Sequence, residues 1–222
     1  MKSDKPPRLM LRLLRFFFYH FYRSLSWSYD LVAWIVSGGR WTSWVLASLR
    51  FIQGPRVLEI GHGPGHLQLA LRQEGFDAFG IDLSRQMGRR AYRNLTRSSE
   101  SPLPQPPCLA RASSFAIPFS ASHFDTAVST FPSEYIIDKR TLSEVFRVLK
   151  PEGKFIVILT GWITDPRPLH RILTWLFRIT GESAELDPKL EIPFREVGFL
   201  TKTQWISLGT SRVFLIEATK SA

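Results

Sequence analysis

Three glycines, each separated from the next by one residue, follow an apolar run in the segment Val57–His66. Because glycine accepts backbone conformations that other residues avoid, Gly61, Gly63 and Gly65 let the main chain come close to a ligand. The spacing differs from the G-x-G-x-x-G pattern, in which a pyrophosphate lies on a helix N-terminus. Glu59, just ahead of the turn, would repel a phosphate but attract an ammonium or sulfonium group. The turn therefore predicts a site for a cationic ligand.

An acidic residue, Asp82, ends the next predicted strand, which covers Ala78–Ile81. In nucleotide-binding βαβ units a carboxylate at this point accepts hydrogen bonds from the ribose hydroxyls. Asp82 therefore predicts a ribose, and Glu59 predicts a positively charged amino-acid tail. S-adenosylmethionine is a nucleoside with such a tail, and we expect it to be the cofactor.

Four segments, in order, resemble the motifs of the class I S-adenosylmethionine-dependent methyltransferases, and within them the group that includes the ubiquinone/menaquinone-biosynthesis enzymes. VLEIGHGPGH is similar to the family motif E/D-x-G-x-G-x-G, and GIDLSRQM is similar to the second motif. IPFSASHFDTAVS and EVFRVLKPEGKFIVI are similar to the segments before and after the fourth strand. The resemblance covers roughly residues 56–159, about half of the chain. It implies a Rossmann-like fold and methyl transfer from S-adenosylmethionine.

The resemblance also implies roles for single residues of the cofactor site. It makes Asp82 the ribose ligand and puts Met87 where relatives often pack a side chain on the adenine. Tyr29 belongs to a segment that closes over the cofactor in some relatives. Ser113 stands where relatives usually carry an aspartate for the adenine amino group, and its hydroxyl can still accept a hydrogen bond. The expected cofactor-binding residues are Tyr29, Glu59, Gly61, His62, Gly63, Gly65, Asp82, Leu83, Met87, Ser113, Ser114, Phe115 and Thr130.

The segment STFPSEYIID follows the fourth predicted strand and lines the acceptor side in the family that this chain resembles. Methyl transfer from a sulfonium is an in-line displacement, so the protein must align the reactants, exclude water and, where needed, accept a proton. Glu134 and Tyr135 are therefore the candidate catalytic residues. The alternative is that Tyr135 packs in the core and Glu134 is solvated. His20, His123 and His170 lack the spacing of metal ligands, so we expect no metal.

Short apolar runs alternate with amphipathic segments from Val57 onward, a pattern typical of βαβ units and a parallel sheet. The sequence predicts an α/β, doubly wound, mostly parallel Rossmann-like sheet with an antiparallel edge strand. The predicted strands cover residues 56–60, 78–81, 108–112, 126–129, 154–159, 202–207 and 212–217, and the predicted helices cover 65–74, 84–97 and 139–149. Residues 150–153 are expected to form a turn after the last of these helices.

Two segments lie outside this core. Residues 1–53 are predicted to form a helical N-terminal extension with a second helix near 41–51, and residues 54–222 to form the methyltransferase domain. A helical insertion at about 165–193 is expected over the carboxyl ends of the strands, where ligands bind in open α/β sheets. The first helix of the extension carries arginines at helical spacing, Arg8, Arg12, Arg15 and Arg23, which interrupt any stretch long enough to span a bilayer. It is expected to pack on the domain as a lid or to contact a membrane; nucleic-acid contact is the third alternative.

The formal net charge of +10 predicts attraction to a polyanion, either an anionic membrane surface or a nucleic acid. The single Cys108 excludes an internal disulfide, and we expect it to be a buried thiol. With no secretion signal recognised, these features favour a cytoplasmic protein that is at most peripheral at the inner membrane face.

We therefore expect a methyltransferase that modifies oxygen or carbon of a small, lipophilic acceptor, because both outer segments combine apolar and arginine-bearing faces. The lack of a D/N-P-P-Y/F sequence argues against amino methylation of nucleobases or amides. One alternative is an RNA methyltransferase that uses the basic helix 85–97, and another is a non-catalytic relative that binds the cofactor. Nucleic acid is the less favoured partner, and the oligomeric state stays open.

Overall fold

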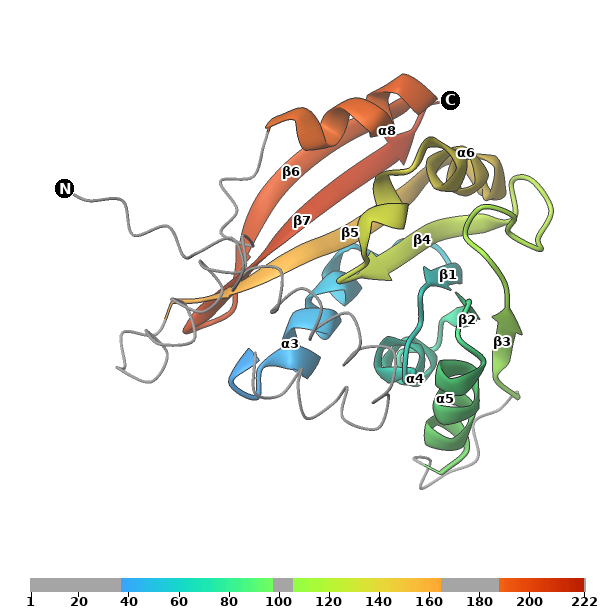
Figure 1. Ribbon diagram of the computed structural model, residues 1–222, viewed down its shortest axis with the longest axis vertical. Helices are drawn as coiled ribbons and strands as arrows, with labels where there is room; N and C mark the ends of the chain where they lie inside the picture. Colours follow the sequence, from blue (N-terminus) through green and yellow to red (C-terminus); the bar gives the residue numbers. More distant parts are fainter. Residues whose placement is uncertain (1–36, 98–105, 165–187, 222) are drawn as a thin grey trace, which may run out of the picture.

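The computed structural model describes residues 37–97, 106–164 and 188–221 (Figure 1). Seven strands form one sheet in the order β3-β2-β1-β4-β5-β7-β6. They are β1 (Arg56–Ile60), β2 (Asp77–Asp82), β3 (Cys108–Arg111), β4 (Phe124–Thr130), β5 (Leu149–Ile163), β6 (Phe199–Ser207) and β7 (Ser211–Lys220). The first five strands are parallel, whereas β7 pairs antiparallel with both β5 and β6. The predicted doubly wound sheet with an antiparallel edge is confirmed.

Helices cover both faces of the sheet. They are α3 (Trp41–Leu46), η1 (Ala47–Phe51), α4 (His66–Gln73), α5 (Arg85–Arg97), η2 (Glu134–Ile137), α6 (Lys139–Val148), η3 (Pro188–Glu191) and α8 (Ile192–Val197). Because side chains alternate along a strand, neighbours on β1 face opposite layers. Val57 packs with α3 and α4, and Leu58 packs with α6 and α8. Figure 1 shows α3, α4 and α5 on one side of the sheet and α6 and α8 on the other.

Several boundaries differ from the predicted ones. The helix expected over 139–149 ends at Val148 because Leu149 already pairs with Phe124. The expected turn at 150–153 is therefore the irregular start of β5, with Glu152 at a φ of 62°. The helix expected near 41–51 is split into α3 and η1.

Two outer regions also differ from expectation. Helix η2 was not predicted. The predicted helix over residues 8–23 and most of the helical insertion expected at about 165–193 lie outside the described residues; residues 188–193 of that insertion form η3 and the start of α8, which continues to Val197. Cys108 is exposed and not buried, because β3 is the edge strand and alternate side chains there face solvent. None of the helices within the described ranges is long and apolar enough to cross a bilayer.

Candidate cofactor site and acceptor wall

The turn between β1 and α4 has all three glycines in the left-handed region, with φ angles of 75° at Gly61, 51° at Gly63 and 87° at Gly65. Residues with a Cβ disfavour this conformation, which accounts for the three glycines. The Gly61 N–H donates to the Ile81 carbonyl at 2.8 Å, so the turn is tied to the end of β2. A Cβ built at Gly63 would meet nothing within 4 Å, so this side of the turn is open to a ligand.

The Asp82 carboxylate joins the two turns at the carboxyl edge of the sheet. Its Oδ2 accepts a hydrogen bond from the Gly63 N–H at 3.0 Å, and its Oδ1 accepts one from the Ser84 N–H at 2.7 Å. A carboxylate has about four lone-pair directions, so both oxygens keep capacity for the hydroxyls of a ribose. Asp82 thus holds the glycine turn in shape as well as offering the predicted ligand contact.

Glu59 lies beneath the turn, facing α4, and is only 2% exposed. Its Oε2 accepts a hydrogen bond at 2.9 Å from Nε2 of Gln68, which also donates to the Phe79 carbonyl at 3.1 Å. Burial raises the pKa of Glu59 to about 8, and the negative charge of Asp82 adds to the shift. A carboxyl group held this way becomes ionised most readily when a cation arrives beside it.

His62 is buried and turns away from the open side of the turn toward α5 and β3. Its Nδ1 lies 2.8 Å from the Gly63 carbonyl, which can only accept, so this nitrogen carries the proton. Burial lowers the pKa of His62, against the opposing effect of Asp82. The neutral ring therefore supports the backbone of the turn.

Exposed apolar side chains flank the position expected for the adenine. Leu83 follows Asp82 and is 66% exposed, and Phe115 follows β3 and is 38% exposed. The Arg140 guanidinium lies 4.0 Å from the centre of the Phe115 ring. Contact with a flat aromatic base would be more favourable for these apolar side chains than contact with water.

The other residues predicted for the adenine side have local contacts. The Ser113 hydroxyl accepts a hydrogen bond from the Phe115 N–H at 3.2 Å, and the Ser114 hydroxyl lies 2.9 Å from that of Thr141 on α6. Met87 is half-buried in the first turn of α5. Tyr29 lies outside the described residues.

The two candidate catalytic residues occupy different environments on η2. Tyr135 is half-buried, and its hydroxyl donates a hydrogen bond to that of Ser129, which in turn donates to the Ile60 carbonyl at 2.7 Å. Burial raises the pKa of Tyr135, with Asp82 and Glu59 adding to the shift, so the phenol stays protonated at neutral pH. Glu134 is exposed, and Thr130 is half-buried at the end of β4.

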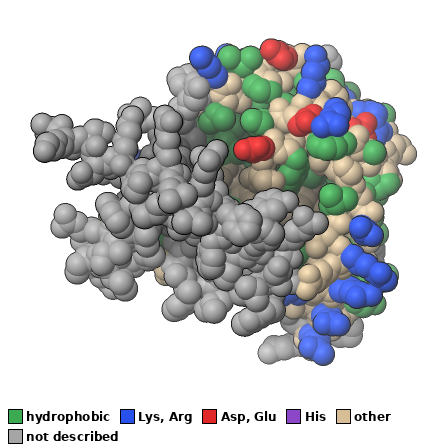
Figure 2. All heavy atoms as spheres, in the orientation of Figure 1, with side chains coloured by type: hydrophobic (Ala, Val, Ile, Leu, Met, Phe, Trp, Pro, Cys, Tyr) green, Lys and Arg blue, Asp and Glu red, His purple; other side chains and the backbone are tan. Residues whose placement is uncertain are grey.

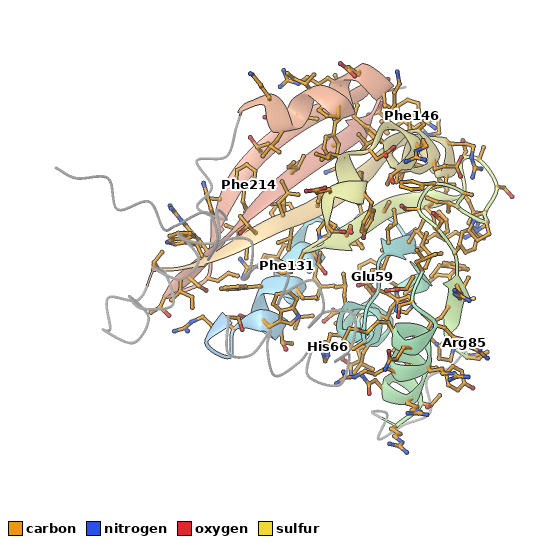
Figure 3. All side chains as sticks on the ribbon, viewed as in Figure 1. Glu59, His66, Arg85, Phe131, Phe146 and Phe214 are labelled. Carbon is orange, nitrogen blue, oxygen red and sulfur yellow. The ribbon has the colours of Figure 1, made fainter. Side chains whose placement is uncertain are left out.

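An aromatic cluster that the sequence did not predict lies after β4. Phe131 has a φ of 51°, which is unusual for a bulky residue, and its ring lies 4.4 Å from that of Trp41 and 6.0 Å from that of Trp44, both on α3. We call Trp41, Trp44 and Phe131 the aromatic wall. Figure 3 shows Phe131 at the end of β4, next to α3. The position of Phe131 in the segment STFPSEYIID indicated the acceptor side, but the neighbouring sequence does not indicate its contact with α3.

The donor set fits S-adenosylmethionine. An open glycine turn, the Asp82 carboxylate, buried Glu59 and the apolar pair Leu83 and Phe115 match a ribose, a cationic tail and an adenine. No group of three or more His, Cys, Asp or Glu side chains with metal-binding geometry occurs within the described ranges.

Comparison with known proteins agrees with this assignment. Residues 58–157 match the family model described as a methyltransferase domain. The chain is 28% identical over 220 residues to a demethylmenaquinone methyltransferase of Symbiobacterium thermophilum, covering 82% of this chain and 85% of that protein. It is 26% identical to a ubiquinone/menaquinone biosynthesis C-methyltransferase of Paraburkholderia phymatum, covering 90% of each.

Solved structures show the same fold. A Thermotoga maritima structure described as an S-adenosylmethionine-dependent methyltransferase aligns with a TM-score of 0.62 at 18% identity, covering 91% of this chain and 100% of the other. Magnesium protoporphyrin IX methyltransferase from Synechocystis, solved with bound S-adenosylhomocysteine, aligns with a TM-score of 0.53 at 18% identity, covering 81% and 80%. The methyltransferase domain at residues 58–157 and these relatives support a class I S-adenosylmethionine-dependent methyltransferase, and the chain is similar to the methyltransferases of ubiquinone and menaquinone biosynthesis.

Proposed function

We propose that this methyltransferase modifies an oxygen or carbon atom of a small, lipophilic acceptor that lies against the aromatic wall. The observation that carries the proposal is the place of Phe131, two residues beyond Ser129, whose hydroxyl contacts the end of β1 just before the glycine turn. A flat apolar molecule on Phe131 and Trp41 would therefore lie beside the methionine end of the cofactor. Aromatic surfaces favour such ligands through burial and ring stacking.

Some residues of the site would bind the cofactor, and others would bind the acceptor. When bound, S-adenosylmethionine supplies an electrophilic methyl group. Asp82 would hold the ribose, Glu59 would attract the ammonium group, and Leu83 and Phe115 would enclose the adenine. Tyr135, which stays protonated and donates its one proton to the Ser129 hydroxyl, would orient the acceptor by accepting a hydrogen bond from it instead of removing a proton from it. The aromatic wall would align the acceptor atom with the methyl group and exclude water from the site.

The names of two relatives support an acceptor of this class. One relative is named for demethylmenaquinone, and another for ubiquinone and menaquinone biosynthesis with transfer to carbon. The aromatic wall is the feature of this chain that would suit such a molecule.

Calorimetric titration with S-adenosylhomocysteine tests the cofactor site. We expect saturable binding to the unchanged protein and at least tenfold weaker binding to the Asp82→Ala variant, because the ribose loses a charge-assisted hydrogen bond. No saturable binding to the unchanged protein would contradict the proposed cofactor site.

Transfer of labelled methyl groups to 1,4-naphthohydroquinone and to an RNA oligonucleotide tests the acceptor class. We expect transfer to the hydroquinone, with a raised KM in Phe131→Ala and unchanged S-adenosylhomocysteine affinity. Phe146→Ala is the matched control. The ring centre of Phe146 lies 5.0 Å from that of Phe199, and Phe146 lies on the side of α6 that faces away from the site (Figure 3). Transfer to RNA alone would establish the RNA alternative instead, and cofactor binding without transfer to either would favour a non-catalytic role.

A further inference from the structure

Helix α5 carries an unbalanced positive charge. Its thirteen residues, RQMGRRAYRNLTR, include five arginines and no acidic residue. Arg85, Arg89, Arg93 and Arg97 are exposed and recur every four residues, and we call them the arginine stripe. Like charges four residues apart in a helix repel each other, so the stripe costs stability unless something anionic binds it. None of the ion pairs found within the described ranges involves these four side chains.

The arginine stripe borders a groove next to the cofactor site. The groove has a volume of about 420 Å³, and Arg85, Arg89 and Arg93 line one bank while Arg111 of β3 lines the other. Asp82 and His62 of the cofactor turns also line this groove. At a rise of about 1.5 Å per residue the stripe is roughly 18 Å long. Figure 2 shows Lys and Arg side chains gathered on this part of the surface, and Figure 3 places Arg85 at the start of α5.

One exposed aromatic side chain gives the same surface an apolar component. Tyr92 lies within the stripe, lines the groove and is 54% exposed. Arginines beside a tyrosine are typical of surfaces that lie in the headgroup region of a bilayer, where the charges meet phosphates and the aromatic ring enters the interface.

The geometry points to the arginine stripe of α5 as a docking surface for an anionic lipid bilayer, with lipid phosphates held between α5 and Arg111. The occupant follows from charge complementarity, from the exposed ring of Tyr92 within the stripe, and, resting on the proposed function, from the need to collect a lipophilic acceptor. A nucleic acid would contact the same arginines, and RNA binding is therefore one outcome of the test. Asp82 lines the same groove, so docking sets the cofactor site close to the membrane.

Sedimentation with vesicles tests the docking surface. The full chain, without cofactor or acceptor, is mixed with vesicles of equal parts phosphatidylglycerol and phosphatidylcholine, or with phosphatidylcholine alone. We expect binding to the anionic vesicles only, weakening as salt rises. Charge reversal of the stripe, Arg89→Glu with Arg93→Glu, should lower the partition coefficient roughly tenfold or more.

A matched variant controls for net charge. Arg50→Glu with Lys202→Glu makes the same change at exposed positions on η1 and on β6, the opposite edge of the sheet from β3. We expect this control to bind vesicles within about twofold of the unchanged protein, because screening limits exposed charges to short range. Equal weakening of both variants would overturn the proposal, as would failure of the unchanged protein to bind anionic vesicles.

Two further measurements separate this inference from others. The first is the affinity of the unchanged protein and of the stripe variant for a single-stranded RNA. If Arg89→Glu with Arg93→Glu weakens RNA binding by a larger factor than vesicle binding, the stripe is a nucleic-acid surface. Titration of the stripe variant with S-adenosylhomocysteine should leave its affinity unchanged. Failure of cofactor binding in the unchanged protein would remove the proposed function, whereas the vesicle result would stand independently.

Discussion

The hydroxyl of Tyr135 lies against Gly61, so close that a Cβ at that glycine would meet it at 2.6 Å. The next nearest atom of the same side chain, Cζ, would lie at 3.8 Å, an ordinary van der Waals distance. Gly61 therefore leaves room for the Tyr135 hydroxyl, and this single oxygen atom connects the acceptor-side segment to the cofactor turn.

This contact predicts that Gly61→Ala destabilises the protein by more than Gly63→Ala does. Both substitutions put an alanine at positive φ, which costs roughly 1–2 kcal/mol, but only Gly61→Ala also meets a neighbouring atom. Adding Tyr135→Phe to Gly61→Ala should recover the additional loss of stability, because the obstructing oxygen is gone. Urea unfolding of the four proteins measures this, and no recovery in the double variant would contradict the contact.

Tyr135→Phe alone tests whether Tyr135 orients the acceptor through a hydrogen bond or acts as a base. Since burial raises the pKa of the phenol, we expect the substitution to lower kcat/KM by roughly tenfold without changing the pH profile between 6 and 9. Disappearance of an ionisation from the profile in the variant would instead make Tyr135 a base.

Glu59 predicts a pH dependence of stability. Its pKa is about 8 in the folded protein against 4.5 for an unperturbed glutamate, so between these values the native state holds a proton that the unfolded state has released. The stabilising contribution is present below pH 4.5 and is lost as the pH rises through 8, with a slope of up to about 1.4 kcal/mol per pH unit.

Glu59→Gln should remove this dependence. The variant is expected to be more stable than the unchanged protein at pH 8, partly because the new amide can donate to the buried, unpartnered Oε1 of Gln68. Its affinity for S-adenosylhomocysteine should nevertheless fall. Thermal unfolding from pH 5 to 9 checks the first expectation, and parallel pH curves for the two proteins would refute it.

Gly161 on β5 is predicted to be intolerant of a side chain. A Cβ there would lie 2.4 Å from Cε3 of Trp44, whose indole N–H donates to the Ser211 hydroxyl at 2.9 Å. Gly161→Ala should cost about 1–3 kcal/mol, as overpacking does, and should raise the KM for the acceptor by displacing the aromatic wall. Combining it with Trp44→Phe, which makes room, should recover stability; denaturant unfolding of the single and double variants would show whether it does.

The parts of the site that lie within one βαβ unit could be predicted from the sequence. The glycine spacing and the strand before it specify a turn, and Asp82 follows the next strand at a fixed place, so their meeting at Gly63 is a consequence of local chemistry. Leu83 and Phe115 were expected in the cofactor site from the family resemblance, whereas their exposure is a finding of the structure.

The acceptor side depended on contacts that no local pattern encodes. Trp41 and Phe131 are ninety residues apart in sequence, and the φ of Phe131 is imposed by packing and by the hydrogen bond of its N–H to Ile158, not by its residue type. The exposure of Cys108 likewise follows from strand order, which places β3 at the edge.

Strand β7 lies between β5 and β6 in the sheet, and Ser211 at its start anchors Trp44. During synthesis, β5 therefore leaves the ribosome with its outer edge unpaired, and α3 emerges well before the residue that fixes its tryptophan. The residues of the cofactor turn and Asp82 all lie in the first half of the domain, whereas the wall for the acceptor is completed only after β7 has emerged. A chain that stops before β7 would therefore carry the residues assigned to the methyl donor but lack the strand that fixes the wall for the molecule that receives the methyl group.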